Sequence, residues 1–403
     1  MLPPNTCTDD DASLRVLFIT PGPVPPSADQ SRNATAFLSP RLHGDIISTV
    51  WTSTKADAED LAESTRHALG AFRYHALPTN DVPALLRPFK ALAFFVATGR
   101  ALSREQGPYH AIIAHGPNTT AIAALILSRL TGASFIVDMH GHPYHGYTYQ
   151  KGAVARVKEW IARRLVPFVL NRTHGIKLLY PTQLKDIELA SAPYTEVFHD
   201  FTAVSTLRPS VSDDGYVLLL GYPWFLKGAD VLIRAFLAIA DRHPNHRLLI
   251  VGHCPDRTPF EELAAGHPRI EFQRGIPAPA AMALIESCTI LALPSRTEAM
   301  GRVILEAYAA RKPVVASNVD GIPNIVEDGV SGLLVTPGDP DDLARKLDLL
   351  LTDKALAERI AAKGHEAAST RFSEKAYAAR FYGFVAEVVR RRRGERGSAR
   401  TVR

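Results

Sequence analysis

Cysteine is scarce in this chain of 403 residues, and its distribution argues against two kinds of site. The three cysteines, Cys7, Cys254 and Cys288, are scattered, and no two of them form a Cys-x-x-Cys pair. An odd and scattered set argues against a disulfide framework and against a cysteine-ligated zinc site, and it suits a reducing compartment. We therefore expect a cytoplasmic protein.

Long hydrophobic runs are also missing. The N-terminal region carries Asp9–Asp11 and no basic leader, and the apolar run Val16–Ile19 is too short for a signal peptide. The uncharged run Ala91–Ala97 falls well short of the roughly 20 apolar residues that a membrane-spanning helix needs. With 46% hydrophobic residues the chain can still bury sizeable cores, and its length suggests about two or three domains.

The positive charge is confined to one end of the chain. Residues 390–403 contain seven arginines and one glutamate, so they alone account for the net charge of +5 and leave the remainder close to neutral. Such a tail could meet anionic lipid or nucleic acid, but no nucleic-acid-binding motif accompanies it. We predict a disordered basic tail at 390–403 and no nucleic-acid partner.

Short apolar segments of strand length alternate with amphipathic segments of helix length along the chain. Because these short segments are apolar throughout, they fit strands covered on both faces, as in parallel sheets. The predicted strands are 16–20, 111–115, 134–140 and 175–179 in the first half, and 216–220, 247–251, 290–294, 313–317 and 332–335 in the second. The pattern predicts a doubly wound α/β fold that occurs twice.

A linker rich in Ser, Thr, Pro and Asp, Phe201–Gly215, separates the two halves. It predicts an N-terminal Rossmann-like domain at 14–205 and a C-terminal Rossmann-like domain at 215–372. The strand ends of both domains should face a central cleft. One more helix is predicted after the second domain, at 373–389.

Two glutamates lie at a junction between a predicted strand and a predicted helix. Pro294 ends the strand and Gly301 is the last irregular residue before the helix, so Glu298 lies in the loop and Glu306 about one turn into the helix. Residues eight positions apart are about 80° apart around a helix, so the two carboxylates cannot form one clamp. We expect them to bind different groups.

The start of this helix is a candidate diphosphate site. Gly301 permits a close backbone approach, and the amides near Gly301, Arg302 and Val303 have no intrahelical partner and carry the positive end of the helix dipole. A ribose attached to the diphosphate would lie within reach of Glu306, whose carboxylate could accept two hydrogen bonds from the diol. Glu298, on the other side of the phosphates, would suit the hydroxyls of a sugar.

The donor-site signature of glycosyltransferase family 4, which comprises retaining enzymes of the GT-B fold, is similar to PSRTEAMGRVILEAYAARKPVVASNVDGIPNIVEDGVSGLLV at 294–335. The start of that family's second domain resembles LLLGYPWFLKGADVLIRAF and LLIVGHCPD, and parts of its first domain resemble AIIAHGPNTT and VDMHG. The resemblance runs from about Val16 to Phe384. It implies a GT-B fold and transfer of a sugar from a nucleotide-diphosphate sugar to an acceptor that is a polysaccharide, a lipid-linked sugar or a small molecule.

The resemblance also implies residue roles. It assigns catalysis to His140, Lys227 and Glu298, with Lys227 on the diphosphate and His140 facing the transferred sugar. The donor-binding residues that it implies are Gly22, Lys227, Gly275, Ile276, Glu298, Ala299, Met300, Gly301, Arg302, Val303 and Glu306. No metal or other cofactor is expected, because Lys227 and the helix amides would stabilise the leaving nucleoside diphosphate. The helix at 373–389 would return to the first domain.

Two departures from the family pattern keep other functions open. Tyr222 stands where the family usually has an arginine, so either Arg296 or Arg302 completes the paired cation or the diphosphate is held less tightly. The glycine pair common after the first strand is replaced by PGPVPPSADQ, in which only Gly22 allows a close approach. The alternatives are a non-catalytic nucleotide-sugar-binding protein and a nucleotide-sugar epimerase.

Two further segments carry predictions. The segment Lys151–Arg172 resembles a basic amphipathic surface helix, which suggests peripheral contact with an anionic membrane at its inner face. The alternative is a helix whose apolar face packs on its own domain. The string Asp339–Asp341 resembles the metal-binding motif of a different glycosyltransferase fold, but its position before a helical segment predicts a helix N-cap.

Overall fold

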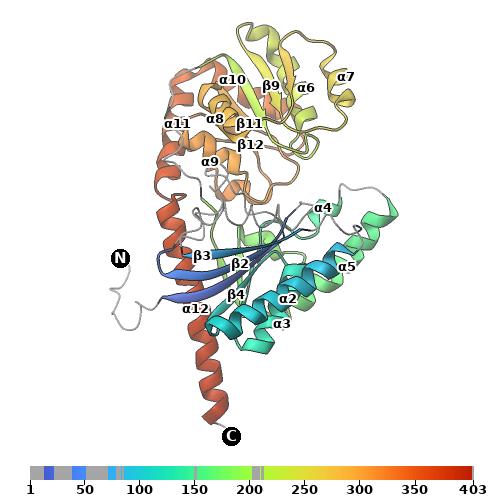
Figure 1. Cartoon of the computed structure of the whole chain (residues 1–403). Coiled ribbons are helices and arrows are strands. Elements are labelled where there is room, and N and C mark those ends of the chain that lie inside the picture. The colour runs from blue at the N-terminus through green and yellow to red at the C-terminus, as the bar shows by residue number, and fades with distance from the viewer. Residues whose placement is uncertain are drawn as a thin grey trace.

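The structure is a computed structural model that describes residues 13–21, 39–50, 71–78, 83, 86–148, 152–201, 209 and 213–401. Two parallel sheets form the cores of two lobes, which lie one above the other in Figure 1. This is the twice-repeated Rossmann-like architecture of the GT-B fold that the sequence predicts. Gly22 and most of the predicted linker lie outside the described residues.

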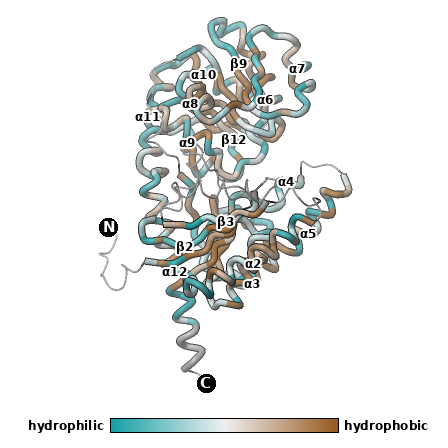
Figure 2. The backbone as a smooth tube through the Cα atoms, viewed as in Figure 1, coloured by the Kyte–Doolittle hydropathy of each residue, from teal (hydrophilic) through white to brown (hydrophobic). Residues whose placement is uncertain are grey.

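The first lobe has a seven-stranded parallel sheet in the order β3-β2-β1-β4-β5-β6-β7. Its strands are β1 (Leu14–Thr20), β2 (Leu42–Val50), β3 (Phe72–Pro78), β4 (Ala111–His115), β5 (Ser134–Asp138), β6 (Gly175–Leu178) and β7 (Tyr194–Val197). Its helices are α2 (Arg87–Gln106), α3 (Thr119–Thr131), α4 (His145–Thr148), α5 (Ala153–Leu170) and the 3-10 helix η3 (Pro181–Leu184). Figure 2 shows that hydrophobic residues (brown) concentrate along the strands of this lobe.

The strands β2 and β3 are absent from the sequence prediction because polar residues interrupt their apolar pattern. Asp45 lies in the middle of β2 and is fully buried. Its carboxylate accepts hydrogen bonds from Tyr109 at 2.7 Å and from Arg73 at 3.0 Å, and lies 3.0 Å from His75. A buried carboxylate with several partners is compatible with a sheet interior, although it breaks the apolar run by which a buried strand is recognised.

The second lobe has a six-stranded parallel sheet in the order β10-β9-β8-β11-β12-β13. Its strands are β8 (Tyr216–Leu220), β9 (Arg247–Val251), β10 (Ile270–Gln273), β11 (Ile290–Leu293), β12 (Val314–Ser317) and β13 (Leu333–Val335). Its helices are α6 (Ala229–Ile239), η5 (Ala240–Arg242), α7 (Thr258–Ala264), α8 (Ala278–Ser287), α9 (Arg302–Ala309), η6 (Ile322–Asn324), α10 (Pro340–Thr352) and α11 (Lys354–Ser369). Asp339 caps α10 by accepting from the amides of Asp341 and Asp342 at 2.9 and 3.0 Å, which confirms the predicted N-cap.

The helix α12 (Glu374–Thr401) leaves the second lobe and runs down along the first, as the red helix in Figure 1 shows. Its aromatic face packs against the first sheet. The ring of Phe381 lies 6.0 Å from that of Phe18, and the ring of Phe384 lies 5.9 Å from that of Phe198. The last helix of the chain therefore contributes to the core of the first lobe.

The C-terminal residues differ from the sequence prediction. A disordered tail is predicted from residue 390, whereas α12 continues to Thr401. Arg390 and Arg391 pair with Glu387 at 2.7 and 2.6 Å, and Arg392 lies 3.8 Å from Glu395. Such pairs, three or four residues apart, stabilise a helix. The prediction of disorder was based on the net charge of the tail, which does not show how the charges are spaced along the helix.

Among the described residues, no helix has both the length and the hydropathy that a membrane crossing requires.

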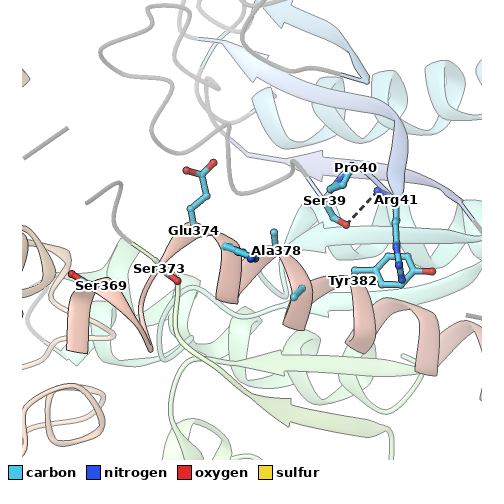
Figure 3. Close-up of a pocket in the computed structure, with 10 residues that line it drawn as sticks. Ser39, Pro40, Arg41, Ser369, Ser373, Glu374, Ala378 and Tyr382 are labelled. Carbon is cyan, nitrogen blue, oxygen red and sulfur yellow. Dashed lines mark hydrogen bonds between the residues drawn. The ribbon is translucent and has the colours of Figure 1, made fainter. Parts of the chain in front are cut away.

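A pocket of about 870 Å³ lies along α12, at the start of β2. Figure 3 shows Ser39, Arg41 and Tyr382 around it, with the Arg41 guanidinium 5.3 Å from the centre of the Tyr382 ring. None of the residues that the sequence assigns to the active site is among those that line it.

Candidate active site

The predicted donor residues of the second lobe lie at the carboxyl ends of neighbouring strands. β8 and β11 pair where the strand order reverses, which is where ligands bind in sheets of this kind. Lys227 follows β8 and Glu298 follows β11, and the Lys227 ammonium contacts the Glu298 carboxylate. Their side chains are only 20% and 13% exposed. The structure thus brings together two of the three predicted catalytic residues.

A close backbone approach holds the two loops together. Gly228 has a φ of +75°, and a Cβ at this position would lie 1.9 Å from the carbonyl oxygen of Pro294. Only glycine fits this contact. The amide of Arg296 donates to the carbonyl of Leu226 at 2.8 Å, which fixes the same two loops a second time. Lys227, between these contacts, is therefore held at the strand ends.

Arg296 is paired with a carboxylate of its own lobe. Its guanidinium donates to both carboxylate oxygens of Asp230 at 2.7 Å and lies 4.0 Å from the centre of the Phe225 ring. A bidentate pair of this kind fixes an arginine firmly, so Arg296 would have to leave Asp230 before it could compensate for Tyr222. Arg302, the other candidate, is exposed at the first position of α9.

The helix α9 begins as the sequence predicts. Gly301 precedes it with a φ of +65°, and Arg302 is its first residue. Glu306 lies on the helix and is half-buried. Met300 is buried in the second-lobe core, and Val303 is partly buried against that core.

Two more of the predicted donor-binding residues lie further along the same sheet edge. Gly275 and Ile276 follow β10, and a pocket of about 650 Å³ lies at the ends of β9 and β10. Gly252, His253, Arg274 and Gly275 are among the residues that line this pocket. The strand order places β9 and β10 on one side of β8, and β11 with Glu298 on the other.

The third predicted catalytic residue lies on the first lobe, where that lobe touches the second. His140 follows β5, and its side chain is 45% exposed. The next residue, Gly141, would place a Cβ 3.9 Å from the Cβ of Ala299. Since Ala299 follows Glu298 directly, the loop that carries His140 meets the loop that carries the predicted sugar-binding carboxylate.

A cluster of charged residues, Lys177, Asp138 and Asp200, lies next to His140. Lys177, in β6, has no exposed surface, and its ammonium lies 3.1 Å from Asp138 and 2.6 Å from Asp200. The Nε2 atom of His140 lies 3.4 Å from Asp138, while His115 lies 3.8 Å from the same carboxylate. One buried cation therefore joins two carboxylates beneath the predicted catalytic histidine.

The charges of this cluster act in opposite directions on the two histidines. Partial desolvation disfavours a charged His140, but the carboxylates of Asp138 and Asp200 outweigh this effect and raise the pKa of His140. Burial and the neighbouring His140 lower the pKa of His115 to about 3. The pKa of Lys177 is well above its usual value because the two carboxylates overcome its burial. At neutral pH the cluster therefore favours a neutral His115.

Lys177, Asp138 and Asp200 are not among the site residues predicted from the sequence. Lys177 could have been noticed, because a single charged residue inside the predicted apolar strand GIKLL is unusual. Asp138, in VDMHG, directly precedes the His140 region. Asp200 had no recognisable pattern, because its partner Lys177 lies 23 residues away in the sequence.

Two family profiles match the chain, one in each lobe. "Glycosyl transferase 4-like domain" matches residues 21–175 and "Glycosyl transferases group 1" matches residues 209–367. The chain belongs to the family 4 glycosyltransferases. The relatives are named glycosyltransferases, which favours the predicted enzyme over the non-catalytic alternative.

This glycosyltransferase is 24% identical to alpha-D-kanosaminyltransferase of Streptomyces kanamyceticus over 77% of the chain and 88% of that protein. It is 33% identical to D-inositol 3-phosphate glycosyltransferase of Xylanimonas cellulosilytica, but over only 48% of each chain.

Its fold is similar to that of sucrose-phosphate synthase from Thermosynechococcus elongatus, with a TM-score of 0.75 and 20% identity over 93% of this chain and 99% of that one. It is also similar to HepE of Anabaena in complex with UDP and glucose, with a TM-score of 0.70 and 18% identity over 93% of this chain and 100% of that one. At these identities the solved structures support the GT-B fold of the glycosyltransferase.

Proposed function

We propose that this glycosyltransferase moves a sugar, with retention and without a metal ion, from a nucleotide-diphosphate sugar to an acceptor hydroxyl. The observation that carries the proposal is the close approach of two loops, where Nδ1 of His145 in the first lobe lies 3.3 Å from the hydroxyl of Thr297 in the second. Thr297 directly precedes Glu298, whose carboxylate contacts Lys227, and His140 lies five residues before His145 in the chain. Likeness to a protein crystallised with UDP and glucose supports the same class of donor.

The proposed chemistry needs positive charge where the sugar–phosphate bond breaks. As that bond breaks, negative charge grows on the nucleoside diphosphate, and the ammonium of Lys227 and the first amides of α9 are fixed nearby. Fixed donors of this kind stabilise the transition state more than the ground state. They would supply the charge stabilisation for which other glycosyltransferases use a metal ion.

Retention rests on the family and on the arrangement of charges. In a front-face displacement, the acceptor oxygen bonds to the anomeric carbon on the side that the phosphate leaves, and the departing phosphate takes the acceptor proton. Near the predicted catalytic histidine, Asp138 and Asp200 are both engaged by Lys177. A carboxylate held by a buried cation is a poor base, so this cluster suits a reaction in which the leaving phosphate accepts the proton.

Replacing Glu306 with alanine should weaken donor binding by about 10- to 100-fold. The reason is the loss of two charge-assisted hydrogen bonds between the carboxylate and the ribose diol, partly replaced by water. Thermal shift with UDP and GDP, followed by titration calorimetry with the stabilising nucleotide, measures the change. Glu358→Ala, an exposed glutamate on α11, is the matched control and should bind as the wild type does. Turnover and affinity equal to wild type in Glu306→Ala would refute the assignment.

We also propose that α5 contacts an anionic membrane surface. Two faces of this helix are apolar. Ala155, Val166, Val169 and Leu170 are buried in the lobe, whereas Val154, Val157, Trp160, Ile161 and Phe168 are between 46% and 69% exposed. Packing on its own domain therefore accounts for only one apolar face. Figure 2 shows hydrophobic segments along this outward-lying helix.

Basic side chains border the exposed apolar face of α5. Residues 152–172 contain five basic residues and one acidic residue, Glu159. Arg164 lies over the ring of Trp160 at 5.5 Å and Arg172 over the ring of Phe168 at 3.8 Å. An apolar stripe edged by arginines is the pattern of helices that lie in the plane of an anionic bilayer surface.

Flotation with liposomes tests the membrane proposal. Wild type should float with vesicles that contain phosphatidylglycerol and much less with pure phosphatidylcholine, because the basic border adds attraction to anionic lipid. Trp160→Glu should abolish flotation, while Leu349→Glu, at an exposed leucine of α10, should not. Equal flotation of wild type on both lipids, or of Trp160→Glu and wild type, would rule out the proposal.

A further inference from the structure

Asp320 has an unusual backbone conformation in the loop that follows β12. Its φ is +46°, a region that side chains other than glycine rarely adopt, although aspartate and asparagine tolerate it better than most. β12 pairs with β11, so the Asp320 loop lies beside the loop that carries Glu298. In this conformation the carboxylate lies within hydrogen-bond distance of that neighbouring loop.

The carboxylate of Asp320 organises the backbone of the donor loop. It accepts a hydrogen bond from the Thr297 hydroxyl at 2.6 Å and one from the Glu298 amide at 3.0 Å. The amide of Gly321 in turn donates to the Glu298 carbonyl at 3.1 Å. Both backbone groups of Glu298 are thus fixed by the Asp320–Gly321 pair, and Glu298 is the residue whose side chain holds Lys227.

A first-lobe histidine joins the same group. The Nδ1 atom of His145, at the start of α4, lies 3.3 Å from the Thr297 hydroxyl and 3.5 Å from Asp320. Because Thr297 donates its proton to Asp320, its oxygen can accept one from Nδ1. The ring of His142 stacks on that of His145 at 3.8 Å, which fixes the orientation of the second ring.

A second contact joins the lobes at this point. A Cβ at Gly321 would lie 1.8 Å from the carbonyl oxygen of Ala299 and 3.0 Å from the Tyr180 ring of the first lobe. Tyr180 is 1% exposed and packs within the core of the second lobe. The Asp320 loop therefore approaches the first lobe at two residues, Tyr180 and His145.

We propose that Asp320 is a positioning residue that makes the placement of Glu298 depend on contact between the two lobes. Its carboxylate holds the donor loop from within the second lobe and receives His145 from the first. When the lobes meet, Thr297 and Asp320 gain a partner, and the loop that positions Glu298 and Lys227 against the donor becomes fixed. The proposal rests on the donor-binding role given above to Glu298 and Lys227.

Replacing Asp320 with glycine tests the carboxylate separately from the backbone conformation. Asp320→Gly keeps a φ of +46° without strain but removes the acceptor, whereas Asp320→Asn keeps an acceptor oxygen without the charge. Ala265→Gly, at another residue of positive φ in the second lobe, is the matched control. In the ligand-free protein, Asp320→Gly should speed hydrogen exchange at the Glu298 amide by about tenfold or more, because a bond to a charged acceptor is lost. Asp320→Asn should show a smaller effect, and Ala265→Gly none.

The turnover of variants at Asp320 and His145 tests whether contact between the lobes positions Glu298. Asp320→Gly and His145→Ala should each lower kcat by about tenfold, with a smaller change in donor KM, and the double variant should be no slower than Asp320→Gly. Asp320→Asn should recover part of the loss. Unchanged exchange in Asp320→Gly, or kcat losses that multiply in the double variant, would overturn the proposal. The exchange measurement needs no donor, so it judges Asp320 even if wild type accepts no nucleotide-sugar, a result that would instead refute the proposed function.

Discussion

Lys227→Ala should slow sugar transfer by about 10²- to 10³-fold, which corresponds to about 2.7–4 kcal/mol of transition-state stabilisation. The ammonium is fixed between two loops and held by Glu298, so it is in place before a donor binds. Such a charge needs little reorganisation when negative charge grows on the leaving diphosphate. The measurement is the rate at which nucleoside diphosphate is released from whichever nucleotide-sugar wild type consumes.

The pairing of Lys227 with Glu298 offers a second explanation for such a loss, and a double variant separates the two. Without the lysine, the Glu298 carboxylate would be left largely buried and would repel the diphosphate. If that repulsion were the cause, Lys227→Ala with Glu298→Gln would be faster than Lys227→Ala alone. We expect the double variant to be at least as slow, because both groups would act on the donor.

A matched control shows whether the effect belongs to the site. Lys363 pairs with Glu366 at 2.8 Å on the surface of α11, and its side chain is 54% exposed. Exposed pairs contribute little, so Lys363→Ala should turn over as wild type does. A loss of less than about tenfold in Lys227→Ala, with Lys363→Ala unchanged, would contradict a direct role of Lys227 in leaving-group stabilisation.

The sequence predicts the architecture because the hydrophobic pattern reports burial directly. The apolar runs at 216–220 and 247–251 coincide with β8 and β9, and strand, loop and helix follow in order around Gly301. The same reasoning failed for β2, where Asp45 is buried among its partners. Burial of a satisfied polar group leaves no mark on hydrophobic periodicity.

The candidate site also has features that the sequence predicts and features that it does not. The approximate locations of Lys227 and Glu298 follow from motifs within one strand, loop and helix, but their mutual contact depends on which strands are neighbours in the sheet. Asp320 of the second lobe lies 3.5 Å from His145 of the first, and the Asp-Gly pair at 320–321 predicts a turn but not this contact. The pairing of Arg296 is hidden for a related reason, since its partner Asp230 lies on another loop–helix junction.

Replacing Lys177 with methionine should lower the free energy of unfolding of the first lobe by about 3–5 kcal/mol. The fully buried ammonium joins Asp138 and Asp200, and methionine fills a similar volume without a charge. Removing one partner of a buried ion pair leaves the other charge without compensation, which is more costly than losing the attraction itself. Denaturant unfolding followed by circular dichroism measures the change.

Two companion variants separate the loss of the cation from the loss of packing. Arg247→Met breaks the surface pair with Glu271, whose side chains are 38% and 47% exposed, and should cost less than about 1 kcal/mol. Lys177→Met with Asp138→Asn should recover part of the stability lost in Lys177→Met, because the uncompensated carboxylate is then neutral. If packing against Phe198 and Tyr377 were the main contribution, the double variant would be no more stable than the single one. Since Tyr377 lies on α12, this buried lysine would also help to hold the C-terminal helix against the sheet that presents His140.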